Sequence, residues 1–156
     1  MMRFARVGPW PVLALLLAGP AQAETYPVDD SASQVLDSNV RMQWVAIAPG
    51  RGSSPNVVGQ TTVIVRLDVA EWQGRNGRIF MLLPARPDGE IEATWTTRGR
   101  LQPGSMRSGE RATVFAGQLT TDTIEDTLVI RLTTNGEYLE RVESLEFSFE
   151  IEVDRT

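Results

Sequence analysis

The stretch TRGRLQPGSMRSGER, residues 97–111, holds the densest positive charge in the chain. Four arginines, Arg98, Arg100, Arg107 and Arg111, stand there against a single acid, Glu110. Glycine and proline recur through residues 98–110, which predicts a long loop. A guanidinium group can hold a carboxylate or a phosphate through two parallel hydrogen bonds. We therefore predict that the four arginines form an anion- or partner-binding loop.

Near the end of the chain, the stretch SLEFSFEIEVD, residues 144–154, alternates apolar and polar residues. This period of two is typical of a strand with one buried face. The apolar row runs from Leu145 to Val153 and is predicted to cover the core. The opposite row is acidic and is predicted to be an interaction face, formed by Glu146, Glu150, Glu152 and Asp154.

Charge is segregated along the chain. Residues 74–111 have seven arginines and four acids, a net charge of +3, whereas residues 112–156 have three arginines and ten acids, a net charge of −7. Three interpretations stay open. The arginines pair with acids of their own molecule, they dock head-to-tail on the acidic face of a second copy, or they bind an external anion such as an acidic polysaccharide or a lipopolysaccharide phosphate.

Missing residue types exclude much catalytic chemistry. The chain has no histidine, cysteine or lysine, and its 15 basic residues are all arginine. A Ser-His-Asp triad, a thiol nucleophile, a Schiff base and an imidazole metal site are therefore ruled out. Carboxylate chemistry remains, with the densest cluster at Asp122, Glu125 and Asp126, which we interpret as a solvated acidic loop. We predict no cofactor, no metal and no catalysis; a small carboxylate-dependent glycan-active enzyme is the remaining catalytic alternative.

Residues 1–23 have the pattern of a cleaved signal peptide. Two arginines precede a short apolar run, and Ala21-Gln22-Ala23 fits a cleavage site. The mature chain would begin at Glu24 and contain no further stretch long enough to span a membrane. Exclusive use of arginine suggests a GC-rich bacterial genome, and we expect the periplasm or the cell surface. Removing the leader leaves 13 arginines and 20 acids, which disfavours nucleic-acid binding.

Period-two patterning dominates the rest of the chain. The apolar run at residues 78–84 predicts a central strand, and Trp44 and Trp95 fall on inward positions. Asn135-Gly136 predicts a two-residue hairpin that sets Leu132 opposite Leu139. Together these signals predict an all-β protein: a single antiparallel β-sandwich, immunoglobulin-like, of seven or eight short strands, with a small β-barrel as the alternative. We assign residues 24–38 to a flexible N-terminal arm and residues 39–156 to the sandwich.

An exported, cysteine-free β-sandwich of this length with an extended N-terminal segment resembles the subunits of chaperone–usher fimbriae. The resemblance rests on size, leader, strand pattern and the absence of cysteine. It implies assembly in which the N-terminal segment of one subunit completes the sheet of the next. NVRMQWVAI, residues 39–47, alternates in the manner of such a donor strand and equally in the manner of a first core strand.

These observations predict an exported, non-catalytic binding or assembly protein. Its arginine-rich loop would recognise an anionic partner, which is another protein, a second copy or an acidic glycan. The alternative is a structural subunit of a surface fimbria or of another head-to-tail assembly.

Overall fold

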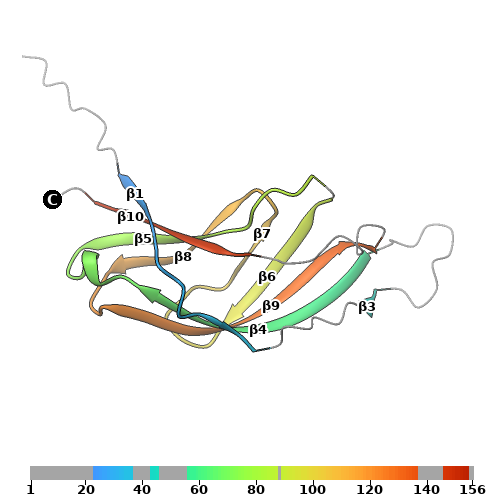
Figure 1. Ribbon diagram of the computed structural model, residues 1–156, viewed down its shortest axis with the longest axis horizontal. Helices are drawn as coiled ribbons and strands as arrows, with labels where there is room; N and C mark the ends of the chain where they lie inside the picture. The colour runs from blue at the N-terminus through green and yellow to red at the C-terminus, as the bar shows by residue number, and fades with distance from the viewer. Residues whose placement is uncertain (1–22, 37–42, 46–55, 88, 137–145, 155–156) are drawn as a thin grey trace, which may run out of the picture.

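The computed structural model describes residues 23–36, 43–45, 56–87, 89–136 and 146–154. Two antiparallel sheets pack face to face, with β10 and β5 across the upper part of Figure 1 and β4 and β9 across the lower part. The predicted β-sandwich is therefore confirmed, and the sheets do not close into a barrel. Ten strands occur in the described residues, because several short edge strands add to those expected.

The first sheet has the order β1-β10-β5-β8, and its strands are β1 (Glu24–Pro27), β10 (Ser148–Val153), β5 (Asn76–Leu82) and β8 (Arg111–Gln118). The second sheet has the order β2-β4-β9-β6-β7, with β3 also paired to β4. Its strands are β2 (Gln34–Val35), β3 (Gln43–Trp44), β4 (Asn56–Asp68), β9 (Thr123–Asn135), β6 (Ile91–Thr97) and β7 (Gly104–Arg107). One turn of 3-10 helix, η1 (Ala70–Trp72), follows β4.

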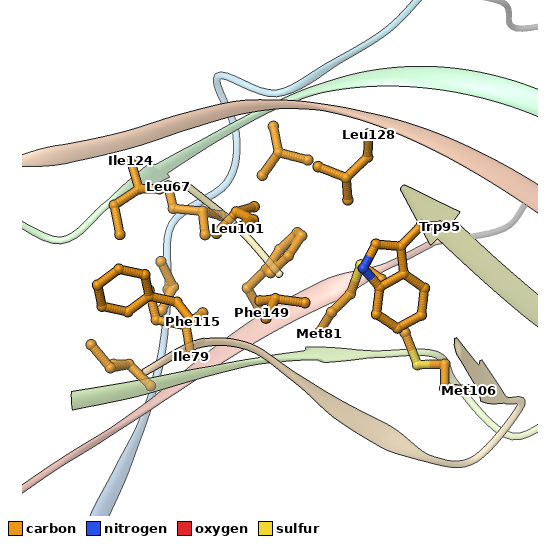
Figure 2. Close-up of a cluster of buried hydrophobic side chains, with 14 of the residues drawn as sticks. Leu67, Ile79, Met81, Trp95, Leu101, Met106, Phe115, Ile124, Leu128 and Phe149 are labelled. Atoms are coloured by element: carbon orange, nitrogen blue, oxygen red, sulfur yellow. The ribbon is translucent and has the colours of Figure 1, made fainter. Parts of the chain in front are cut away.

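The core lies between the two sheets and follows the alternation in the sequence. Figure 2 shows Leu67, Ile124 and Leu128 from the second sheet directed towards side chains of the first, among them Ile79 and Phe115. The last strand contributes Phe149, Ile151 and Val153, all buried, as its apolar row predicts. Leu145, the first member of that row, lies outside the described residues.

The two inward-predicted tryptophans have different outcomes. Trp95 is 1% exposed, and its indole N–H donates to the carbonyl oxygen of Gln102 at 3.0 Å, so the prediction for this residue is confirmed. Trp44 is 55% exposed, so its assignment to the core is wrong. The reason is its place on β3, a two-residue strand at the outer edge of β4, where the opposite sheet does not cover it.

The residues assigned to a flexible arm contribute strands instead. Glu24–Pro27 pair with β10 in the first sheet, and Gln34–Val35 pair with β4 in the second. Between them the chain crosses from one sheet to the other, held by a bridge between Asp29 and Asp68. In Figure 1 this is the blue segment that passes from β1 down to β4. The expected irregular lead-in therefore does not hold for residues 24–36.

The hairpin predicted at Asn135-Gly136 is also wrong. Its second strand, including Leu139, lies outside the described residues, but both edges of β9 are already occupied. Leu132 pairs with Gly59 of β4 on one side and with Ala93 of β6 on the other. No edge of β9 is left for a hairpin partner, because long-range pairing takes precedence over the local turn signal.

Within the described part of the chain, no helix is long and apolar enough to cross a membrane.

Candidate functional site

Residues 98–110 do not form one loop. Gly104–Arg107 make up β7, which pairs with β6, so the predicted long loop is wrong at its centre. Arg98 and Arg100 precede β7, whereas Arg107 ends it and Arg111 begins β8. The strand separates the four predicted arginines into two pairs, one at each of its ends.

Arg107 and Arg111 pair with acids of their own molecule. The Arg111 guanidinium lies 2.9 Å from a carboxylate oxygen of Glu152 and 3.9 Å from one of Glu150. Arg107 approaches the carboxylate of Glu90 at 3.6 Å. Arg111 thus meets the acidic last strand of its own molecule, as the intramolecular interpretation of the charge segregation expects, whereas Glu90 lies within the basic segment itself. The pair between Arg107 and Glu90 is exposed on both sides and contributes little to stability.

Arg100 makes contacts within its own molecule, whereas the side chain of Arg98 makes none with the described residues. The Arg100 guanidinium donates to the hydroxyls of Thr121 and Thr120 at 3.0 and 3.3 Å, and its central carbon lies 5.9 Å from the Phe115 ring centroid. The side chain of Arg98 is exposed and has no ion pair or hydrogen bond to the residues that the structure describes. Of the four predicted residues, Arg98 keeps the most capacity for an external anion.

The loop that holds Arg98 and Arg100 does bind a carboxylate, but through its backbone. Asp126 is 4% exposed, and its two oxygens accept hydrogen bonds from the N–H groups of Arg98, Gly99 and Leu101 at 2.7 to 3.1 Å. The N–H of Thr127 donates to the same carboxylate. The interpretation of Asp126 as part of a solvated acidic loop is therefore wrong. The alternation along β9 indicates that Asp126 is buried, because it shares the inward parity of Ile124 and Leu128.

The predicted acidic face is divided by its neighbours. Glu152 is bound between two arginines, Arg111 at 2.9 Å and Arg78 at 3.1 Å, and its side chain is only 13% exposed. Glu150 faces Arg111 less closely. The backbone carbonyl of Asp154, rather than its carboxylate, accepts a hydrogen bond from Arg75 at 2.8 Å. Glu146 stands apart from these pairs, at the start of the segment that leads into β10.

Glu146 lines a groove of about 370 Å³ that opens between the two sheets, a feature that sequence reasoning missed. The floor is apolar and is made by core residues of four strands. The rim is polar and contains two carboxylates. The lining residues are Asp30, Ser33, Gln34, Val35, Val63, Val65, Met81, Leu128, Ile130, Glu146, Phe147 and Phe149. These residues come from five separate segments of the chain, so no local motif could reveal the groove.

The groove lies where the first sheet is incomplete. β1 pairs with β10 from Val153 back to Glu150, and the N–H of Val28 donates to the carbonyl of Phe149 at 2.9 Å. The chain then leaves the first sheet, because Asp29 pairs with Asp68 of the second. Beyond this point, Ser148, the first residue of β10, has no strand neighbour on that side among the described residues, and residues 146–147 precede the strand. β10 therefore presents an unpaired edge of one residue beside the apolar groove.

Asp29 and Asp30, at the crossing between the sheets, have opposite electrostatics. The hydroxyl and then the backbone N–H of Ser31 donate to the Asp29 carboxylate and lower its pKa. Burial beside the groove raises the pKa of Asp30, an effect that a hydrogen bond from its own backbone opposes. Asp30 has no cation beside it in the described part of the chain. Burial therefore makes its charged form less favourable than that of an exposed aspartate.

The remaining carboxylates do not suggest a metal centre. Among the described residues there is no group of three or more histidine, cysteine, aspartate or glutamate side chains that could hold a metal ion.

A comparison with protein-family models and with curated proteins finds no match for this chain. The function proposed below is therefore inferred from the geometry of the groove and of the edge of β10.

Proposed function

We propose that the chain is an exported, non-catalytic assembly protein whose copies join head-to-tail by exchanging β1. The supporting observation is the way β1 attaches. β1 is a four-residue edge strand at the predicted mature N-terminus, and all four of its side chains are exposed. It pairs with β10 and with no other strand among the described residues. β10 of another copy offers the same hydrogen bonds, and exchange of an identical element is a low-cost route to association.

The groove supports the same proposal. Among the described residues, Ser148 of β10 has no strand neighbour on the side of β1, and the apolar groove lies beside it. An extended segment added there would gain main-chain hydrogen bonds from the edge and bury its apolar side chains against the floor. A head-to-tail contact of this kind generates rings or filaments, which fits the alternative of a fimbria-like structural subunit.

An engineered disulfide tests the exchange, because the chain has no cysteine of its own. Thr25 of β1 lies directly opposite Glu152 of β10. Opposite residues on antiparallel strands have Cα atoms about 4.5–5.5 Å apart, within disulfide range. In the variant Thr25→Cys/Glu152→Cys, exchanged strands would give a ladder of covalent oligomers on a non-reducing gel, growing with protein concentration. Strands kept within one molecule would give only the monomer.

Two control variants make that result interpretable. Gln60 and Arg131 are also directly opposite, on β4 and β9, which the proposal keeps within one molecule. Gln60→Cys/Arg131→Cys should give only monomer. Glu152→Cys alone should give at most a dimer. If Thr25→Cys/Glu152→Cys yields monomer at every concentration, strand exchange through β1 is wrong.

A second candidate keeps the anion-binding interpretation for Arg98, whose guanidinium is exposed and without a described partner. In this case the partner would be an acidic glycan. Arg98→Ser should then weaken binding to an acidic polysaccharide column, while Arg107→Ser should leave binding almost unchanged because Arg107 already faces Glu90. Equal elution of both variants and the wild type would remove this candidate.

A further inference from the structure

Two carboxylates border the groove without a cation to balance them. Asp30 and Glu146 both line it, and neither forms an ion pair with the residues that the structure describes. None of the described lining residues is basic. The other acids on this side of the first sheet differ in this respect, since Glu150 and Glu152 both face Arg111. Within the described part of the chain, the groove is therefore a local site of negative charge without a basic lining residue.

The floor of the groove adds a second requirement. Val65, Met81, Leu128, Ile130 and Phe149 are each less than 5% exposed, yet all five border the opening. A volume of about 370 Å³ lies at the lower end of the range of about 300–1,000 Å³ typical of ligand sites. Beside this floor Val35 is 56% exposed, and Val63 and Phe147 are only partly buried, so an occupant can bury apolar groups against these three lining residues and place positive charge at the rim.

The edge of β10 favours a polypeptide over a free small cation. Ser148, the first residue of β10, has no described strand neighbour on the side of β1, and residues 146–147 lead into it beside the groove. Asp30 lies where the chain has crossed to the second sheet. An extended segment paired at Ser148 would direct alternate side chains into the groove, where a cationic side chain among apolar ones would meet the carboxylates.

We infer that Asp30 and Glu146 make the groove selective for an extended polypeptide segment in which apolar side chains flank an arginine or a lysine. This inference rests on the proposed function, since it specifies the segment that the open edge of β10 receives. The cation would stabilise the charge of the partly buried Asp30 and of Glu146 beside it in the groove, and charge-assisted hydrogen bonds are the stronger kind. A segment with alternating apolar residues but no cation would leave both carboxylates uncompensated.

A matched pair of synthetic peptides tests the selectivity. The first is a nine-residue peptide in which valine alternates with serine or threonine and the central residue is arginine; the second has glutamine at the centre. Binding to the purified protein is measured by calorimetry, and the site by amide chemical shifts of residues lining the groove. We expect the arginine peptide to bind at least about tenfold more tightly, and the shift changes to centre on Val35, Val63 and Phe149.

Variants of the protein separate charge from shape. Asp30→Asn/Glu146→Gln should bring the ratio of the two dissociation constants to about one and leave the glutamine peptide almost unaffected. The control Glu92→Gln/Asp122→Asn removes the same charge at exposed positions away from the groove and should preserve the ratio.

If both peptides bind the wild type equally at the groove, the selectivity is wrong and the assembly proposal stands. If neither peptide shifts the groove residues, the site itself is wrong, and only the disulfide experiment still bears on exchange of β1. A free amine such as phenethylamine binding as tightly as the arginine peptide would show that no polypeptide is required and overturn the inference.

Discussion

The guanidinium of Arg111 lies 4.2 Å from the centroid of the Phe80 ring, on the outer face of the first sheet. Phe80 is 8% exposed although it points away from the inter-sheet core, because Arg111 covers its ring and Arg78 also approaches it, at 5.9 Å. Glu152 binds both arginines and fixes them in place. The densest contact between the predicted basic and acidic residues is thus a structural unit within one molecule.

This unit predicts that Arg111 stabilises the fold and Arg98 does not. Arg111→Ser removes a cation–π contact, the cover of an aromatic ring and an ion pair with a nearly buried carboxylate. We expect a loss of about 1–3 kcal/mol in the free energy of unfolding, measured by urea denaturation. Arg98→Ser is the matched control, and its effect should stay within about 0.5 kcal/mol. Equal effects of the two substitutions would contradict the assignment.

The backbone contacts of Asp126 predict that its replacement lowers the stability of the fold more than the replacement of Arg111 does. Four backbone N–H groups, of Arg98, Gly99, Leu101 and Thr127, donate to its carboxylate. Asp126→Ala would leave several of these donors unpaired at a site with little solvent, at a cost of about 3 kcal/mol or more. Asp126→Asn keeps one acceptor oxygen and should cost less. Urea denaturation gives the loss, and amide exchange should quicken first in the segment 98–101.

An exposed aspartate nearby provides the comparison. Asp122→Asn alters the same residue type in the loop before β9, where the side chain is exposed. Its effect should be within about 0.5 kcal/mol. If Asp126→Ala were equally mild, the backbone contacts of the carboxylate would not hold the loop.

The layers and the core of this fold are readable from the sequence, whereas the partners of each strand are not. Alternation assigned Phe149, Ile151 and Val153 to the interior because period two is a local property. The pairing of β9 with β4 joins residues far apart in the sequence, such as Arg66 and Glu125 at 59 positions, and no local signal reports it. The Asn-Gly turn signal failed for that reason. The strand β1 was not predicted, because an edge strand with four exposed side chains shows no alternation of apolar and polar residues.

The candidate site was only partly predictable, for a related reason. Composition identified arginines and acids as the charged groups of interest, but it could not show that Arg111 is already bound by Glu152. The groove is made where five segments meet, so its two carboxylates, Asp30 and Glu146, line one site only in the folded chain. Asp126 differs, because its inward parity on β9 is a local feature that the sequence itself displays.

Two adjacent aspartates should titrate on opposite sides of their ordinary pKa of 3.8. Asp29 is stabilised as a carboxylate by Ser31, so its pKa is lowered, and its contribution to stability is present above pH 3.8 and is lost as pH falls through the lowered value. Burial raises the pKa of Asp30, so this residue keeps its proton to a higher pH in the folded protein than in the unfolded chain. The contribution of Asp30 to stability therefore falls as pH rises from 3.8 through the raised pKa. Carboxyl chemical shifts measured against pH check both directions.

Asp30→Asn isolates the second effect. The variant should lack the fall in stability that the wild type shows in the window just above pH 3.8, so the difference in unfolding free energy between them should change across that window. Ser31→Ala should act in the other direction on Asp29 and return its pKa towards 3.8. Shifts of the same sign for Asp29 and Asp30 would contradict the electrostatic account of the crossing.

The contact between Gly104 and Trp95 predicts a site where even a methyl group is too large. Gly104 of β7 lies opposite Trp95 of β6, and a Cβ added there would stand 2.9 Å from an atom of the buried indole. Gly104→Ala should therefore cost about 1–3 kcal/mol through overpacking, whereas the exposed neighbour Ser105→Ala should change stability by less than about 0.5 kcal/mol. Trp95→Phe removes the ring that the new methyl would strike, so the double variant Gly104→Ala/Trp95→Phe should lose less than the sum of the two single losses. Strict additivity in urea denaturation would mean that the indole does not oppose a side chain at position 104.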